Sequence, residues 1–306
     1  MPVIEINSLT KDYEVGFWRK RKVRALDGLS LTVQPHQIFG FLGANGAGKT
    51  TTLKLLMRLI FPTAGSARVL DRDISDVSMH ARIGYLPENP YFYDYLTASE
   101  FLNYCGELFG LNKNLRDART KELLTRVNLD PNSWNRQMRK FSKGMLQRVG
   151  LAQALVNDPE IVFLDEPMSG LDPVGRRQVR DLIAALRDEG KTVFMCSHIL
   201  SDIEVLCDSV AILKSGRVAR AGSLEQLRAA ETGAIEIIAM CERPANDQLK
   251  VSLTGVAEVS ATPGGLRIEV GQEKDVDVVL ARLRAVNGKL ISVNPVKQSL
   301  EELFLG

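Results

Sequence analysis

A glycine-rich segment between a buried strand and a helix constrains this chain more than any other feature. Residues 38–42 form an apolar run that is typical of a buried strand. The next eight residues fit the pattern G-x-x-x-x-G-K-[ST] and read Gly43-Ala44-Asn45-Gly46-Ala47-Gly48-Lys49-Thr50. Apolar residues at helical spacing follow, from Leu53 to Ile60, and Pro62 and Gly65 are expected to end that helix. This order predicts a phosphate-binding turn.

The residue types in this turn suit an anion. Glycines let the backbone wrap a phosphate with no Cβ in the way, and consecutive N–H groups at a helix N-terminus then face the β-phosphate. Lys49 supplies a positive charge to the β- and γ-phosphates, and the Thr50 hydroxyl is a magnesium ligand. An ordinary glycine-rich turn with an exposed lysine is the structural alternative.

A pair of carboxylates meets the second requirement of such a site. Residues 161–164 form another apolar run, and Asp165 and Glu166 follow it. Open α/β sheets bind ligands at the carboxyl ends of their strands, where both acids fall. We expect Asp165 to hold magnesium, directly or through water, and Glu166 to orient and polarise the attacking water. Alone, two acids at a strand end would fit a solvated loop equally well.

Composition argues against several other kinds of site. The 306 residues include 39 basic and 37 acidic ones, for a formal net charge of +2, so no nucleic acid partner is expected. Four cysteines without a C-x-x-C pair and three histidines argue against zinc and against a disulfide framework. The sequence contains no apolar run of about 18 residues, so no transmembrane helix is predicted. Residues 1–10 lack the pattern of a signal peptide. We expect a cytoplasmic protein.

Alternating apolar runs and helical patterns indicate the fold class α/β. A third apolar run covers residues 192–196, and a helical pattern from about 176 to 188 precedes it. Strands that alternate with helices predict a largely parallel sheet with helices on its faces. Residues from about 97 to 157 hold helical patterns without a convincing strand, which predicts a helical subdomain. Residues 211–218 are expected to form a hairpin that turns at 215–216.

The pattern changes after Gly222, so we divide the chain into residues 1–222 and a smaller domain of residues 223–306. The segments of the second part follow the order β-α-β-β-α-β, which is typical of a ferredoxin-like α+β domain. The expected elements are strands at 234–238, 256–259, 266–270 and 290–293, a turn at 263–265, helices near 247–251 and at 276–286, and a short last helix from Ser299.

The most specific segment precedes the carboxylate pair. It reads Phe141-Ser142-Lys143-Gly144-Met145 and continues with Gln147-Arg148. Physically, a serine at the start of a helix that runs to about Val156 caps that helix and exposes N–H donors to an anion. Together with the glycine-rich turn, the segment resembles the signature motif of the ATP-binding cassette (ABC) family, and the resemblance covers residues 3–222. Lys143 and Met145 stand where the family usually has glycine and glutamine.

The resemblance implies a P-loop NTPase of the ABC nucleotide-binding type and assigns roles to individual residues. ATP would be bound by residues 43–51, Thr51 included, with Mg²⁺ as the cofactor. The signature residues Ser142, Lys143, Gly144 and Met145 would bind the nucleotide of a second protomer. Asp172, in the sequence Ser169-Gly170-Leu171-Asp172, resembles the D-loop residue that links two active sites across a dimer.

Three more positions follow from the resemblance. Tyr13 falls where the family places an aromatic ring on adenine, although a half-buried tyrosine in an N-terminal hairpin is the alternative. His198 resembles the switch histidine that contacts the γ-phosphate. Glu88, after Ile83-Gly84-Tyr85-Leu86-Pro87, stands where the family usually has a glutamine that contacts magnesium and water. We count Glu166, His198 and Glu88 as catalytic and Thr50, Asp165 and Glu88 as metal-binding residues.

The resemblance also implies a function. The chain would bind and hydrolyse ATP as the peripheral subunit of an ABC transporter, of the ABC-2 exporter type, at the cytoplasmic face of the cell membrane. It would form a homodimer or pair with a related ATPase subunit, and it would act on a separate integral membrane permease. A soluble ABC ATPase that acts on nucleic acid or ribosomes is the alternative. These residues indicate neither the transported substrate nor the transport direction.

Overall fold

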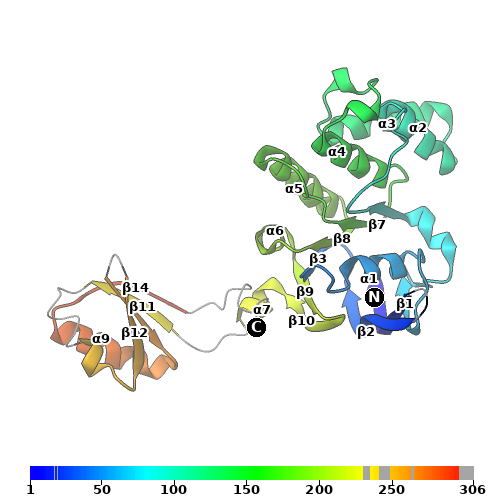
Figure 1. Ribbon diagram of the computed structural model, residues 1–306. Coiled ribbons are helices and arrows are strands. Elements are labelled where there is room, and N and C mark those ends of the chain that lie inside the picture. Colours follow the sequence, from blue (N-terminus) through cyan, green and yellow to red (C-terminus); the bar gives the residue numbers. More distant parts are fainter. Residues whose placement is uncertain (17, 19, 230–234, 241–248, 263–264, 296–306) are drawn as a thin grey trace. The chain divides into compact units, whose positions relative to one another are not determined.

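Two units make up the chain. The computed structural model describes residues 1–306 except 17, 19, 230–234, 241–248, 263–264 and 296–306 (Figure 1). Unit 1 covers Met1–Leu224 and unit 2 covers Glu225–Gly306. Helix α7 (Leu224–Ala229) begins at the division. Each unit is described below by itself.

A six-stranded sheet forms the centre of unit 1. Its strand order is β10-β9-β3-β8-β7-β6, parallel from β9 to β6, with β10 antiparallel at one edge. Every residue of β3, β7 and β8 is buried, which explains why these strands are continuous apolar runs. The largely parallel α/β sheet is therefore confirmed. The strand bounds are β3 Ile38–Gly43, β6 Ile83–Leu86, β7 Ile161–Asp165, β8 Thr192–Ser197, β9 Ser209–Lys214 and β10 Arg217–Ser223.

A second, antiparallel sheet of unit 1 was not predicted as such. Its order is β2-β1-β4-β5, and the register of β1 with β2 shifts at several bulges. Those bulges break the alternation of apolar and polar residues, so the sequence pattern is weak. The bounds are β1 Ile4–Val15, β2 Arg21–Val33, β4 Ala64–Val69 and β5 Arg72–Asp73.

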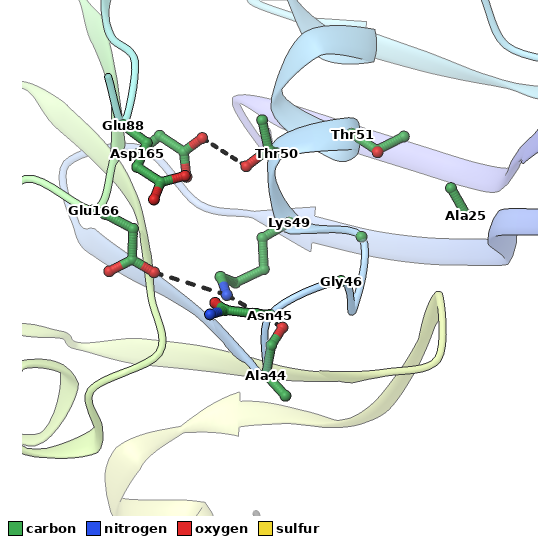
Figure 2. Close-up of a pocket in the computed structure, with 11 residues that line it drawn as sticks. Ala25, Ala44, Asn45, Gly46, Lys49, Thr50, Thr51, Glu88, Asp165 and Glu166 are labelled. Atoms are coloured by element: carbon green, nitrogen blue, oxygen red, sulfur yellow. Dashed lines mark hydrogen bonds and ion pairs between the residues drawn. The ribbon is translucent and has the colours of Figure 1, made fainter. Parts of the chain in front are cut away.

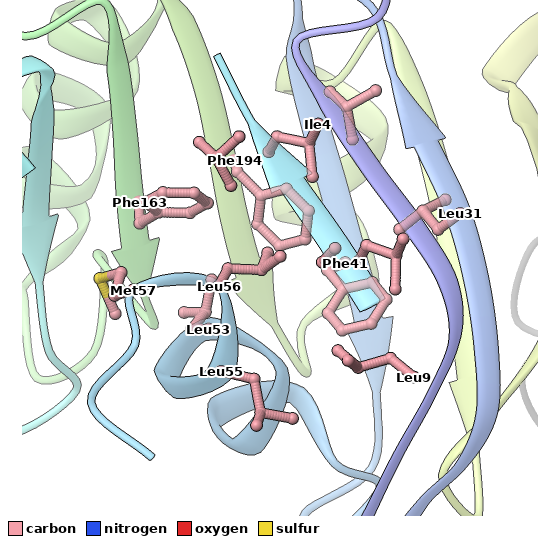
Figure 3. Close-up of a cluster of buried hydrophobic side chains, with 14 of the residues drawn as sticks. Ile4, Leu9, Leu31, Phe41, Leu53, Leu55, Leu56, Met57, Phe163 and Phe194 are labelled. Carbon is pink, nitrogen blue, oxygen red and sulfur yellow. The ribbon is translucent and has the colours of Figure 1, made fainter. Parts of the chain in front are cut away.

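The main core lies between the two sheets of unit 1. Helix α1 (Lys49–Leu56) contacts strands of both sheets, and its leucines are buried there (Figure 3). The ring centroid of Phe194 lies 5.3 Å from that of Phe41 and 5.7 Å from that of Phe163. Such packing fixes α1, and with it the glycine-rich turn at its start, against the strand ends.

Helix α1 ends earlier than predicted. The sequence pattern continued to Ile60, yet the helix stops at Leu56. Arg58 adopts a left-handed φ of 55°, its N–H donates to the Leu55 carbonyl, and the Leu59 N–H donates to the Lys54 carbonyl. This pair of hydrogen bonds is a Schellman motif, which usually has glycine at the left-handed position. Arginine there gave no stop signal.

The predicted helical segment is present within unit 1. Thr97 caps its first helix with a capping box, and Ser142 caps the last one. The helix bounds are α2 Ala98–Leu108, α3 Lys113–Arg126 and α4 Lys143–Ala154, with 3₁₀ turns at Pro131–Ser133 and Met138–Lys140 and an earlier one at Val77–Arg82. Helices α5 (Pro173–Asp188) and α6 (Leu200–Leu206) follow. Helix α5 starts three residues before the predicted 176 because Asp172 caps it and Pro173 suits the first turn.

The predicted hairpin joins β9 and β10. Ser215 and Gly216 have φ values of 49° and 78°, and two positive values at these positions characterise the tight hairpin turn. The turn therefore lies where the sequence placed it.

Unit 2 has ferredoxin-like pairing. Its antiparallel sheet has the order β12-β13-β11-β14, and helix α9 packs on one face through Val279 and Leu283. Residues 249–252 are helical. The rest of the helix expected near 247, the turn residues 263–264 and the helix expected from Ser299 lie outside the described residues. The bounds are β11 Ile235–Met240, β12 Ala257–Thr262, β13 Gly265–Val270, α9 Val276–Ala285 and β14 Lys289–Pro295, with a 3₁₀ turn at Glu273–Asp275.

Candidate functional site

The glycine-rich turn carries the backbone geometry that its sequence predicts. Gly46 and Gly48 have φ values of 80° and 112°, in the left-handed region that side chains disfavour. A Cβ on Gly48 would also lie 2.6 Å from Leu26 Cδ2 and 2.8 Å from the Ala25 carbonyl oxygen. Gly48 is the N-terminal cap of α1, so the helix N-terminus faces the turn. The turn therefore presents N–H groups to an anion.

Lys49 folds back over the turn (Figure 2). Its ammonium donates to the Gly43 carbonyl at 2.6 Å and lies 3.7 Å from Glu166 Oε1. Both side chains are more than nine-tenths buried. A buried ammonium with oxygen partners on two sides would also suit the oxygens of a phosphate group.

Thr50 and Asp165 are hydrogen-bonded to one another in the wall of a cavity. The Thr50 hydroxyl donates to Asp165 Oδ2 at 2.7 Å. The other oxygen, Oδ1, is buried and has no hydrogen-bond partner among the residues that the structure describes. Burial raises the pKa of the Asp165 carboxyl, and the charges of Glu166 and Glu88 raise it further against the opposing effect of the Thr50 hydrogen bond.

Glu166 occupies a strained and nearly buried position. Its φ is 51°, a left-handed value that costs a non-glycine residue about 1–3 kcal/mol. Besides Lys49, its Oε1 contacts His198 Nδ1 at 2.9 Å. The carboxylate thus lies between Lys49 of the glycine-rich turn, or phosphate loop, and the predicted switch histidine, at the carboxyl ends of the neighbouring strands β7 and β8.

Lys49, Thr50, Asp165 and Glu166 line a cavity of about 380 Å³. Ten predicted residues line it, together with one that sequence reasoning missed: Ala25, Ala44, Asn45, Gly46, Gly48, Lys49, Thr50, Thr51, Glu88, Asp165 and Glu166. Ala25, on β2, offered no chemical signal because its side chain is a methyl group. Gly43 and Ala47 belong to the same turn without lining the cavity. The Tyr13 hydroxyl lies 3.5 Å from Thr51 Oγ1, beside the cavity.

The signature segment lies elsewhere. Ser142, Lys143, Gly144 and Met145 do not line this cavity. Ser142 is exposed at the start of α4, where its Oγ accepts from the Met145 N–H at 3.3 Å. Asp172 starts α5, with its Oδ1 accepting from the Gly175 N–H at 3.1 Å. Both residues are helix caps, as a serine and an aspartate at these positions should be.

A smaller cavity of about 240 Å³ adjoins the first through Glu166. Its other lining residues are Pro167, Met168, Ser169, Gly170, Leu171, Arg176, Ser197, His198, Ile199 and Asp202. Asp202 is buried and accepts from Arg176 at 3.2 Å. Glu166 therefore borders both the phosphate loop and the segment that contains Asp172.

Comparison with known proteins gives the class that this fold and site define. The family model described as "ABC transporter" matches residues 26–169. The chain belongs to the family of ABC transporter ATP-binding proteins, and the fold and family predicted from the sequence are confirmed. Among the described residues, no helix combines the length and apolarity needed to cross a bilayer.

Individual relatives support this membership. An uncharacterized ABC transporter ATP-binding protein of Synechocystis sp. is 44% identical over 304 residues, which cover 99% of this chain and 84% of that protein. The bacitracin transport ATP-binding protein BcrA of Bacillus licheniformis is 40% identical over 220 residues, 71% of this chain and 68% of BcrA. A solved dimeric ATP-binding cassette in a post-hydrolysis state, bound to ADP and Pi, superimposes with a TM-score of 0.67 at 25% identity and covers 72% of this chain and 98% of that one.

Proposed function

We propose that this chain is a magnesium-dependent ATPase that couples ATP-driven dimer closure to transport through a separate membrane permease. The observation that carries the proposal is the contact set around Glu166. Its carboxylate lies 3.7 Å from the Lys49 ammonium and 2.9 Å from the His198 ring, next to the Thr50–Asp165 pair. This arrangement supports a site for a γ-phosphate and its attacking water.

The donor set fits Mg²⁺. This ion prefers oxygen ligands and few protein contacts, and the buried Asp165 Oδ1 supplies an oxygen that lacks a partner among the described residues. Thr50 Oγ1, Asp165 and Glu88 would hold the ion. When bound, magnesium would neutralise charge on the phosphates.

The protein's own residues have distinct tasks in hydrolysis. The turn N–H groups and Lys49 bind and orient the phosphates. Glu166, which is nearly buried, accepts a proton from the attacking water at its carboxylate, and His198 holds Oε1 of that carboxylate from the exposed side. Tyr13, beside Thr51, would support the base of the nucleotide.

The second half of the site would come from another protomer. Ser142 is exposed and does not line the cavity of its own chain. A nucleotide bound by the phosphate loop of one protomer and by Ser142 of the other favours the closed dimer, and hydrolysis removes that bias. The related cassette solved as a dimer with ADP and Pi supports this arrangement.

The transport role rests on the relatives. BcrA is named for bacitracin transport, which supports a transport role for this chain. The ABC-2 exporter type is our proposal from the resemblance of residues 141–145 to the signature motif. We propose a peripheral location on the cytoplasmic face of the membrane, through a permease, and a dimer-stabilising or regulatory role for unit 2. ATPase activity that rises with nucleic acid or ribosomes, and not with a co-purified membrane partner, would favour the soluble alternative.

The test replaces the proposed general base. Glu166→Gln should lower turnover by roughly 10²–10⁴-fold and leave ATP binding intact, because the amide cannot accept the proton. Turnover is measured by phosphate release and binding by titration with a fluorescent nucleotide. Removal of Mg²⁺ with a chelator should abolish the wild-type turnover.

The matched control is Glu122→Gln, the same change on α3, where the half-exposed Glu122 pairs with the more buried Arg119. It should leave turnover within about twofold, since Glu122 does not line the nucleotide cavity. If Glu166→Gln hydrolyses ATP as fast as Glu122→Gln, the assignment of Glu166 is wrong.

A further inference from the structure

A buried glutamine connects helix α4 to the backbone that carries Glu166. Gln147 is only 2% exposed. Its Nε2 donates to the Pro167 carbonyl at 2.9 Å and reaches the Glu166 carbonyl at 3.5 Å. This hydrogen bond links α4 to the backbone of Pro167, twenty residues further along the chain.

The segment that Gln147 holds needs external support. Glu166 has a left-handed φ of 51°, and strained residues persist only where surrounding contacts fix them. Pro167 has no N–H, so it cannot anchor itself by donating a hydrogen bond. On the other side, the Glu166 N–H donates to the Cys196 carbonyl of β8 at 3.0 Å. From α4, Gln147 holds the next residue through its hydrogen bond to the Pro167 carbonyl.

The start of α4 packs closely against this segment. A Cβ on Gly170 would lie 2.5 Å from Lys143 Cδ, and a Cβ on Gly144 would lie 3.3 Å from Leu171 Cδ2. The first turn of α4 therefore packs directly on residues 170–171. This contact places the first turn of α4 against the segment, and the Gln147 amide lies one turn further along the helix.

We propose that Gln147 is a positioning residue for catalysis: it holds the Glu166–Pro167 backbone so that the Glu166 carboxylate stays between Lys49 and His198. Gln147 does not line the nucleotide cavity, so its effect passes through Glu166. The inference rests on the proposed ATPase function, which Glu166→Gln tests separately. It assigns the action of Gln147 to the Glu166 of its own chain.

The first experiment separates binding from turnover. Gln147→Met removes the donor at similar length, and Gln147→Leu removes it with a shorter apolar side chain. Both should lower kcat by roughly 10–100-fold while the Kd for a fluorescent nucleotide changes less than about twofold, because a displaced catalytic group costs rate rather than phosphate affinity. The control is Gln153→Met on the same helix, at a half-buried position, which should keep wild-type kcat. Unchanged kcat in both Gln147 variants would overturn the proposal.

The second experiment asks which active site is affected. Dimers are assembled from two differently tagged chains, one of which carries Glu166→Gln, so that only the other chain hydrolyses ATP. Gln147→Met in the hydrolysing chain should lower turnover by the same roughly 10–100-fold. Gln147→Met in the Glu166→Gln chain should leave turnover near that of the unsubstituted mixed dimer. Equal losses in the two arrangements would indicate a general folding defect or an action on the partner's nucleotide, and would overturn the proposal.

A third readout needs no ATPase activity. The Ser169 N–H donates to the Glu166 carbonyl at 3.1 Å, within the segment that Gln147 supports. Hydrogen exchange of residues 166–171 should be faster in Gln147→Met than in Gln153→Met, because the segment has lost one anchor. Exchange at the same rate in the two variants would contradict the positioning role.

Discussion

At the scale of single residues, the site concentrates negative charge around one buried cation. Asp165, Glu166 and Glu88 line the same cavity, and Lys49 contacts only one of these carboxylates. Burial raises the pKa of Asp165, and the neighbouring carboxylates raise it further. The nucleotide-free molecule therefore retains an unfavourable charge that a divalent cation would relieve.

This charge gives a prediction for stability. The pKa of Asp165 is higher in the folded chain than in the unfolded chain, so its ionised form destabilises the fold once the pH rises above the unfolded value. Asp165→Asn should raise the Tm of the metal-free, nucleotide-free protein at neutral pH by a few degrees and abolish turnover. The gain should shrink as the pH falls, because Asp165 is then protonated in both states. Thermal unfolding measured across pH in the presence of a chelator checks this; a lower Tm for Asp165→Asn at neutral pH would contradict it.

At the scale of elements, three helix starts carry residues that we propose for the nucleotide site. Ser142 caps α4, Asp172 caps α5, and Gly48 precedes α1. A capping residue must have its side chain at the helix end, where it is accessible and close to backbone N–H groups. The same local geometry therefore stabilises each helix and exposes groups that suit an anion.

A pair of substitutions can separate the effect of a helix cap on stability from its proposed effect on turnover. Ser142→Ala and Thr97→Ala each remove a cap in the helical segment and should each cost about 1 kcal/mol in the free energy of unfolding. Only Ser142→Ala should also lower ATPase turnover, because only Ser142 is proposed to contact a nucleotide. Chemical denaturation gives the stabilities and phosphate release gives the rates. Equal effects on turnover would mean that Ser142 acts as a cap alone.

Elements with a strong local signal were predictable from the sequence. The strand before Gly43, the carboxylates after β7 and the hairpin turn at 215–216 depend on neighbouring residues. The early end of α1 was not predictable from the sequence. The left-handed position that ends a helix is usually glycine, and here it is Arg58. The place of Ala25 in the cavity wall and the hydrogen bond from Gln147 to the Pro167 carbonyl depend on contacts between distant segments, which no local pattern encodes.

At the scale of the whole molecule, one chain carries the two segments that we propose to form the separate halves of a nucleotide site. The phosphate loop lines the cavity with Asp165 and Glu166, whereas Ser142 lies outside it. If two protomers complete each other's sites, ATP links them, and the free energy of its second contact favours the closed state. That linkage would turn hydrolysis into a movement that a membrane partner could use.

Sedimentation velocity of the Glu166→Gln chain tests this account most directly. With saturating Mg²⁺ and ATP the chain should sediment as a dimer, and with ADP, or after the added substitution Ser142→Arg, it should return to a monomer. A chain that binds ATP yet remains a monomer at every protein concentration, or a dimer that ignores both nucleotide and Ser142, would contradict the composite site.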